Sequence, residues 1–238
     1  MSTWAMRSTK AATVPRYRPP TLPPVPARLH LVRHGEVHNP GGVVYAGLPG
    51  FSLSTLGRAQ AAAAAEYLAD SGATVLVTSP LDRAQETAEF VARRLGIEPV
   101  VAAGLTEWGL ATRWAGTAWT DLDRRFPGEL AAYAADPATL PFSPESLAAL
   151  ADRTHAVVTR VERLHPGAVV VAVSHQDPIQ ALRRALCCDG FADFHSDKPG
   201  HATVITLEPF SGAWREIGSW YPDMASPAFP PLPLPGTT

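Results

Sequence analysis

Short apolar runs alternate with helical segments along the middle of this chain, and this alternation restricts the fold more than any other feature. The runs RLHLV (28–32), ATVLVTS (73–79) and AVVVAVSH (168–175) each have the length and composition of one buried strand. The last run is the most apolar, so we place it near the centre of the sheet. Strands that alternate with helices are typical of a mostly parallel sheet covered on both faces, which predicts an α/β fold.

The helical segments carry recognisable start and stop signals. A helix is expected over 53–70 with Ser54 as its N-cap, and another over 80–96 with Pro80 in its first turn and Gly96 as its stop. Two further helices are predicted at about 143–164 and at 177–186, and a short strand at 98–103. The segments 202–209 and 213–220 are typical of a hairpin, and 104–142 has no regular pattern.

Two proline-rich ends flank this alternating region. Residues 1–27 and 221–238 are predicted to be disordered arms, whereas 28–220 is predicted to form one domain. A hydrophobic content of 46% over 238 residues is enough for a sizeable core. We interpret both ends as plain tails, with a docking motif for a proline-binding partner as the alternative.

Charge and cysteine content exclude several classes of protein. The formal net charge of -2 argues against nucleic-acid binding, and no apolar stretch has the length of a membrane span. The N-terminal region also lacks the apolar segment of a secretory signal. The two cysteines, Cys187 and Cys188, are adjacent and cannot build a disulfide framework. We therefore predict a cytoplasmic protein with no nucleic-acid or membrane partner.

Polar side chains follow three of the predicted strands at the point where each strand ends. Arg33-His34 follows the first run, Ser79-Pro80 the second and Ser174-His175 the most apolar one. In α/β sheets the carboxyl ends of parallel strands form the edge where ligands bind. Arg83, in the first turn of a predicted helix, and Glu107, in the loop after a short strand, are expected to reach the same edge.

These side chains suit a phosphate ester. The planar guanidinium groups of Arg33 and Arg83 bind phosphate oxygens in pairs, and helix N-termini near Pro80 and Gln176 favour an anion. A neutral imidazole can attack phosphorus, and an acid on the opposite side can protonate the leaving oxygen. Gly35 is interpreted as the residue that lets the backbone approach the phosphate closely.

The chain resembles the histidine phosphatase superfamily, branch 1, the phosphoglycerate mutase-like proteins. The resemblance runs from about Arg28 to Trp220, and the stretches that carry it are LVRHGE (31–36), LSTLGRAQA (53–61), SPLDRAQETA (79–88), LTEWG (105–109), PES (144–146) and VSHQDPI (173–179). It implies a three-layer α/β/α sandwich on a mostly parallel sheet with one antiparallel strand, and a reaction without metal or other cofactor.

The resemblance also implies roles for single residues. His34 corresponds to the phosphorylated nucleophile, and Arg33, Arg83 and His175 correspond to the rest of the phosphate pocket. Glu107 corresponds to the proton donor. Asn39 and Gln176 are expected as substrate-binding groups at the pocket edge, although the family usually has asparagine one position later than Asn39 and glycine at the position of Gln176.

Several residues leave alternatives open. Glu36, Glu145 and Asp177 compete with Glu107 for the role of acid. The spacing of His30, His34 and His38 would suggest metal ligands on a helix, but not on a strand, so no metal site is predicted. The other histidines, His155, His165, His195 and His201, are interpreted as surface or packing residues. The aromatic residues of 108–142 form either local packing or an apolar lid over the leaving group.

The preferred hypothesis is a metal-independent phosphomonoesterase that acts on a small phosphorylated metabolite. The alternatives are a mutase that returns the phosphoryl group to another hydroxyl of its substrate, and a non-catalytic phosphate-binding scaffold. Few charges and many aromatic residues in 108–142 favour an apolar or sugar-like leaving group over a highly charged bisphosphate. A phosphoprotein substrate and any oligomeric state remain open.

Overall fold

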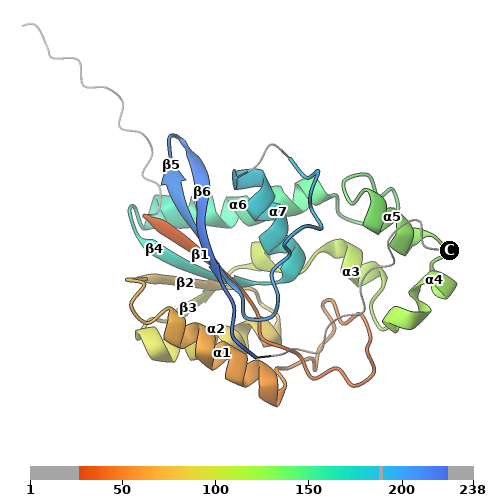
Figure 1. The fold of residues 1–238 in the computed structure, drawn as a ribbon, viewed down its shortest axis with the longest axis horizontal. Coiled ribbons are helices and arrows are strands. Elements are labelled where there is room, and N and C mark those ends of the chain that lie inside the picture. The colour runs from red at the N-terminus through yellow and green to blue at the C-terminus, as the bar shows by residue number, and fades with distance from the viewer. Residues whose placement is uncertain (1–26, 188–189, 225–238) are drawn as a thin grey trace, which may run out of the picture.

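A computed structural model describes residues 27–187 and 190–224, and the predicted arms lie almost entirely outside this part of the chain. Its strands are β1 (Arg28–Arg33), β2 (Val75–Thr78), β3 (Pro99–Val101), β4 (Val169–Ser174), β5 (Val204–Phe210) and β6 (Ala213–Trp220). Its long helices are α1 (Thr55–Tyr67), α2 (Asp82–Leu95), α6 (Leu147–Leu164) and α7 (Gln176–Cys187). Figure 1 shows these elements as one sheet with helices on both sides.

The strands form one six-stranded sheet in the order β3-β2-β4-β1-β5-β6. The pairs β2–β3, β2–β4 and β1–β4 are parallel, whereas β5 is antiparallel to both β1 and β6. One strand, β5, therefore runs against the other five. The mostly parallel sheet with one antiparallel strand is confirmed, and β4 lies inside it as its apolar sequence indicated.

The two faces of the sheet are covered by different helices. On one face, Leu29 and Leu31 of β1 pack with Val158 of α6 and Leu182 of α7. On the other face, Val32 belongs to a cluster with residues of α1, its C-cap and α2, namely Ala64, Ala65, Leu68, Ala84, Ala88 and Val91. The side chains of a strand alternate between its two faces, and this divides the core in two. The result is the predicted three-layer α/β/α sandwich (Figure 1).

The local helix signals are mostly confirmed. Ser54 caps α1 by accepting a hydrogen bond from the Gly57 backbone, and Gly96 ends α2 with a left-handed φ of 69°. The predicted start of α2 is wrong by two residues, because the helix begins at Asp82 and Pro80 lies before it. Helix α6 likewise begins later than predicted, after its N-cap Ser146.

The region 104–142 is not irregular, which corrects the sequence prediction. It contains the short helices α3 (Gly109–Arg113), α4 (Leu122–Arg125) and α5 (Glu129–Ala135), and the 3-10 turns η1 (Ala103–Leu105) and η2 (Trp119–Asp121). Helices this short are too brief to nucleate alone and give little periodic signal. They are held by a third core cluster that includes Trp108, Trp114 and Tyr133. In Figure 1 this group of helices lies beside one end of the sheet.

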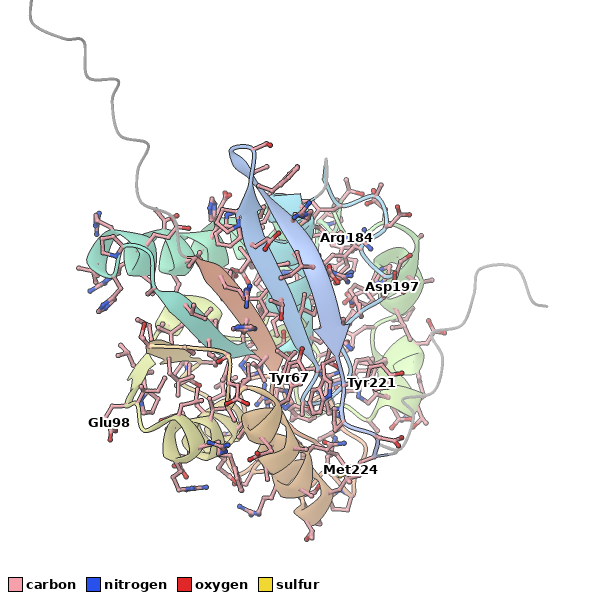
Figure 2. All side chains as sticks on the ribbon, turned by 60° about the vertical axis from the view of Figure 1, so that its left-hand side comes forward. Tyr67, Glu98, Arg184, Asp197, Tyr221 and Met224 are labelled. Atoms are coloured by element: carbon pink, nitrogen blue, oxygen red, sulfur yellow. The ribbon has the colours of Figure 1, made fainter. Side chains whose placement is uncertain are left out.

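The predicted hairpin is confirmed. Ser211 and Gly212 form its turn with φ angles of 51° and 83°, the left-handed conformation that suits a two-residue connection. At the far end of the hairpin, the Trp220 ring stacks on Tyr67 of α1 with centroids 4.6 Å apart. Figure 2 shows Tyr67 at this end, below the hairpin. No helix in 27–187 or 190–224 is long and apolar enough to cross a membrane.

Candidate active site

The ends of three strands bring the predicted site residues together. Arg33 is the last residue of β1, and the backbone N–H of His34 donates to the Ser174 carbonyl at the end of β4 over 3.0 Å. Ser79, after β2, donates its backbone N–H to the Val173 carbonyl. The His34 and His175 rings therefore meet edge to face, with centroids 5.2 Å apart.

His34 is held as a neutral imidazole of defined tautomer. Its Nδ1 lies 2.7 Å from the Gly35 carbonyl, which can only accept, so Nδ1 carries the proton. Its Nε2 then accepts a hydrogen bond from Arg83 Nε over 3.2 Å. Burial lowers the pKa of His34 well below its ordinary value, and the nearby charges of Arg83, His175 and Arg33 lower it further. The lone pair of Nε2 is thus available at neutral pH.

His175 and Arg33 also have polar atoms left for a ligand. His175 Nε2 bonds the Ser79 hydroxyl over 2.7 Å, while its Nδ1 is buried and has no partner among the described residues. Arg33 donates from Nη1 to the Pro199 carbonyl over 2.9 Å, and its Nη2 contacts His201, but its buried Nε likewise has no partner there. Buried polar atoms without partners cost about 1–3 kcal/mol each. An anion beside these groups would lower this cost.

Glu107 has the properties of a proton donor. Its Oε1 accepts the Trp108 backbone N–H over 2.8 Å, and the side chain lines a cavity. Burial is the main cause that raises the pKa of Glu107 to about 7, and the negative charge of Asp177 raises it further against the opposing effect of Arg83. Near neutral pH the group therefore exchanges a proton readily.

Arg153, which the sequence analysis did not single out, fixes the loop that carries Glu107. Its Nη1 donates to the carbonyls of Gly104 and Thr106 over 2.8 and 2.7 Å, and its Nη2 donates to the Glu107 carbonyl over 3.0 Å. Its Nε also pairs with Glu145 over 2.6 Å. Arg153 lies in the middle of α6, where a single arginine gives no signal of this role.

The three other candidate acids already form hydrogen bonds or ion pairs with neighbouring side chains. Glu145 is bound by Arg153 and also accepts the Gly109 backbone N–H. Glu36 accepts a hydrogen bond of 2.6 Å from the Ser54 hydroxyl, and Asp177 pairs with Lys198 over 2.6 Å. Glu107 therefore remains the best candidate for the acid.

Gly35 has a packing role that the sequence did not indicate. A Cβ on Gly35 would lie 2.3 Å from the Gly57 carbonyl oxygen, and a Cβ on Gly57 would lie 1.9 Å from the Glu36 carbonyl oxygen. The two glycines thus allow the loop after β1 to pack directly on the first turn of α1. Close packing of backbone on backbone therefore requires glycine at position 35, and the approach to a phosphate stays a prediction.

Of the two predicted pocket-edge residues, one lines the cavity. Gln176 is among the lining residues, and its amide donates to the Pro199 carbonyl over 3.0 Å. Asn39 is not among the lining residues, and neither are His34, Arg83 and His175, so its binding role stays a prediction. Its side chain donates to the Val43 carbonyl over 2.8 Å and accepts the Val43 N–H, so it closes a local turn.

Two residues near His34 were missed. His201, interpreted from sequence as a surface or packing residue, contacts Arg33 Nη2 over 3.1 Å, and its ring centroid lies 5.7 Å from that of His34. Tyr45 lies under the Arg83 guanidinium at 4.7 Å. Both come from loops without regular pattern, so only the folded chain brings them to the site.

A cavity of about 320 Å³ adjoins this cluster. One part of its wall is polar, with Arg33, Glu107, Gln176, Asp177 and Lys198. The rest is largely apolar and aromatic, comprising Val44, Tyr45, Ala46, Leu110, Ala111, Trp114, Trp119 and Tyr133. Trp114 and Tyr133 also belong to the third core cluster, whereas Trp108 is buried away from the cavity. The aromatic residues thus serve both as packing and as a cavity wall.

Together, the fold and the site define a class of protein: an α/β protein with a buried histidine among arginines at the carboxyl ends of its strands. The family model described as histidine phosphatase superfamily (branch 1) matches residues 29–219, and the chain belongs to this family. In 27–187 and 190–224, no three His, Cys, Asp or Glu side chains gather as a metal ion would require.

The chain is similar to several mycobacterial proteins. An uncharacterised protein of Mycobacterium tuberculosis strain H37Rv is 40% identical over 169 residues, which cover 67% of this chain and 78% of that one. The glucosyl-3-phosphoglycerate phosphatase of the same strain is 34% identical over 167 residues, covering 67% and 74%. A solved structure of mycobacterial glucosyl-3-phosphoglycerate phosphatase with VO3 aligns with a TM-score of 0.73 and 31% identity, over 82% of this chain and 99% of that one.

Proposed function

We propose that this protein is a metal-independent phosphomonoesterase that acts on a small phosphorylated metabolite through a phosphohistidine at His34. The observation that carries the proposal is the neutral His34, whose Nδ1–H is bound to a carbonyl and whose Nε2 lone pair points at Arg83. The relatives named as phosphatases of glucosyl-3-phosphoglycerate support a small phosphorylated substrate.

In the first step, the phosphoryl group takes the place of the hydrogen bond between Arg83 Nε and His34 Nε2. Nε2 attacks phosphorus, a P–N bond forms and the P–O bond to the leaving group breaks. Protonated Glu107 gives its proton to the leaving oxygen, so an alcohol departs. The Gly35 carbonyl stabilises the positive charge that develops on the ring through the Nδ1–H bond.

The non-bridging phosphoryl oxygens carry the charge that spreads in the transition state. Arg33 and Arg83 supply positive charge beside His34, and both are buried, so solvent screens them weakly. The unpartnered atoms, Arg33 Nε and His175 Nδ1, are candidates for direct bonds to these oxygens. Because these groups are fixed before substrate arrives, little reorganisation is needed during the reaction.

In the second step, water replaces the alcohol. Ionised Glu107 removes a proton from the water, the oxygen attacks phosphorus and the P–N bond breaks. Inorganic phosphate leaves, His34 returns to its neutral form and Glu107 is again protonated. A pKa of about 7 suits a group that must donate a proton in one step and accept one in the next.

The test is release of p-nitrophenol from p-nitrophenyl phosphate in the presence of EDTA, with wild type compared with His34→Ala. We expect turnover by wild type and none by the variant. Equal turnover by both would refute the role of His34. Interconversion of phosphoglycerates without phosphate release would instead identify a mutase.

A further inference from the structure

Three side chains of the cavity wall form a compact polar cluster away from His34. The ammonium of Lys198 lies 2.6 Å from Asp177 Oδ1 and donates to the Tyr133 hydroxyl over 2.6 Å. That hydroxyl lies 3.4 Å from both carboxylate oxygens of Asp177. The side chains of Lys198 and Asp177 are only 12% and 16% exposed. Lys198 also lies over the rings of Phe194 and Tyr133, at 4.3 and 5.0 Å from their centroids.

Within this cluster, the negative charge of Asp177 neutralises the positive charge of Lys198. We call the part of the cavity beside this pair, away from Arg33, the outer cavity. Among the lining residues, the arginine, lysine, aspartate and glutamate side chains are Arg33, Lys198, Asp177 and Glu107. Arg33 is bound to Pro199 and His201 next to His34, and it belongs to the phosphate pocket. The cation that remains for a leaving group is Lys198, and Asp177 already pairs with it.

We propose that the Asp177–Lys198 pair determines specificity by selecting substrates with an uncharged leaving group and disfavouring those with a second anionic group. This inference rests on the proposed function and specifies its substrate class, which differs from glucosyl-3-phosphoglycerate because that substrate's leaving group carries a carboxylate. A carboxylate in the outer cavity would have to displace Asp177 from Lys198 and would then lie beside the Asp177 charge. Like charges brought together in a partly buried site are strongly unfavourable.

The shape of the wall agrees with this selection. Leu110, Trp114 and Trp119 offer apolar surface for the body of a leaving group. Asp177 and Tyr133 offer oxygen atoms, which suit hydroxyl groups better than a carboxylate. Asp177 stands in the first turn of α7, where a negative charge interacts favourably with the helix dipole.

The experiment compares phenyl phosphate with 4-carboxyphenyl phosphate, two probes that differ by one carboxylate. The measured quantity is the ratio of kcat/KM for the carboxylated probe to that for phenyl phosphate. Asp177→Asn frees the Lys198 charge, so we expect this ratio to rise on the order of tenfold. Lys198→Gln leaves Asp177 uncompensated, so the ratio should fall by a similar factor. Glu86→Gln is the matched control, since it removes the carboxylate of the surface pair with Arg58 and should leave the ratio unchanged.

A second readout separates specificity from a purely structural role. The negative charge of Asp177 helps to raise the pKa of Glu107. In Asp177→Asn, the loss of phenyl phosphate turnover at alkaline pH should therefore begin at lower pH than in wild type. A folding defect alone would reduce the rate without moving this profile.

The outcomes are distinct. If variants with wild-type folding hydrolyse phenyl phosphate and neither Asp177→Asn nor Lys198→Gln changes the ratio, the proposed specificity is wrong and the phosphatase assignment stands. If only one variant folds, its kcat/KM ratio alone tests the proposal, because Asp177→Asn should raise the ratio and Lys198→Gln should lower it. If wild type hydrolyses neither probe, the phosphatase assignment is refuted and the specificity proposal falls with it.

Discussion

Replacing Glu107 by glutamine should abolish the proton donor and yet stabilise the protein at alkaline pH. The pKa of Glu107 is raised from 4.5 to about 7, mainly because burial disfavours the charged form. At about 1.4 kcal/mol per pKa unit, this shift corresponds to about 3 kcal/mol. The carboxyl lines a cavity, so water screens part of this cost and we expect about 2 kcal/mol.

The direction in which stability changes with pH follows from proton binding to Glu107. The folded state holds the Glu107 proton more tightly than the unfolded chain does, so this group favours folding below pH 4.5. This contribution is lost as pH rises from 4.5 through about 7. Glutamine carries no such charge and can still accept the Trp108 N–H through its amide oxygen. The variant should thus match wild type near pH 4.5 and exceed it above pH 7.

The assay is urea denaturation of wild type and Glu107→Gln, followed by fluorescence at pH of about 5 and about 8.5. Groups that do not interact with Glu107 titrate alike in both proteins, so the difference between them reports on this carboxyl and its immediate neighbours. We expect the difference in free energy of unfolding to increase by about 2 kcal/mol between the two pH values. If the difference in free energy of unfolding between the two proteins stays constant with pH, the pKa of Glu107 is not raised by burial and the reasoning is refuted.

Three further predictions concern the site and its support. With an alkyl phosphate as substrate, kcat/KM should fall as pH rises above about 7, because Glu107 loses the proton that the leaving group needs; a pH-independent rate would exclude this role. Gly57→Ala should cost about 3 kcal/mol or more in urea denaturation, whereas Gly41→Ala, whose nearest contact would be 3.6 Å away, should cost little. Arg153→Met should lower both stability, by about 2 kcal/mol, and kcat/KM, because the Glu107 loop loses its three carbonyl contacts; unchanged activity would contradict that positioning.

The sequence predicted the sheet, and the meeting of His34 with His175, because both depend on local patterns. Apolar runs identify buried strands, and the polar residues that end them must meet where parallel strands end. His34 and His175 were located in this way, with ring centroids that lie 5.2 Å apart in the structure. Ser54 and Gly96 marked helix ends because capping is decided within one turn of the helix.

The parts that sequence analysis missed depend on contacts between distant segments. Tyr45 and His201 reach the site from loops whose paths no periodic pattern records. Arg153 supports Glu107 across 46 positions of sequence, and Gly35 owes its identity to Gly57 on another element. The short helices of 104–142 were overlooked because tertiary packing around Trp114, rather than helix propensity, holds them.

The central claim is that the phosphoryl group passes through His34. The most direct test is rapid quenching of the enzyme during turnover of p-nitrophenyl phosphate, in alkali because phosphohistidine is labile to acid, followed by mass spectrometry of the peptide that contains His34. We expect a phosphoryl group on His34 in wild type, accumulation in Glu107→Gln because its dephosphorylation is slow, and none in His34→Ala. Steady turnover by wild type with an unmodified His34 peptide, or a phosphoryl group on another residue, would contradict the account.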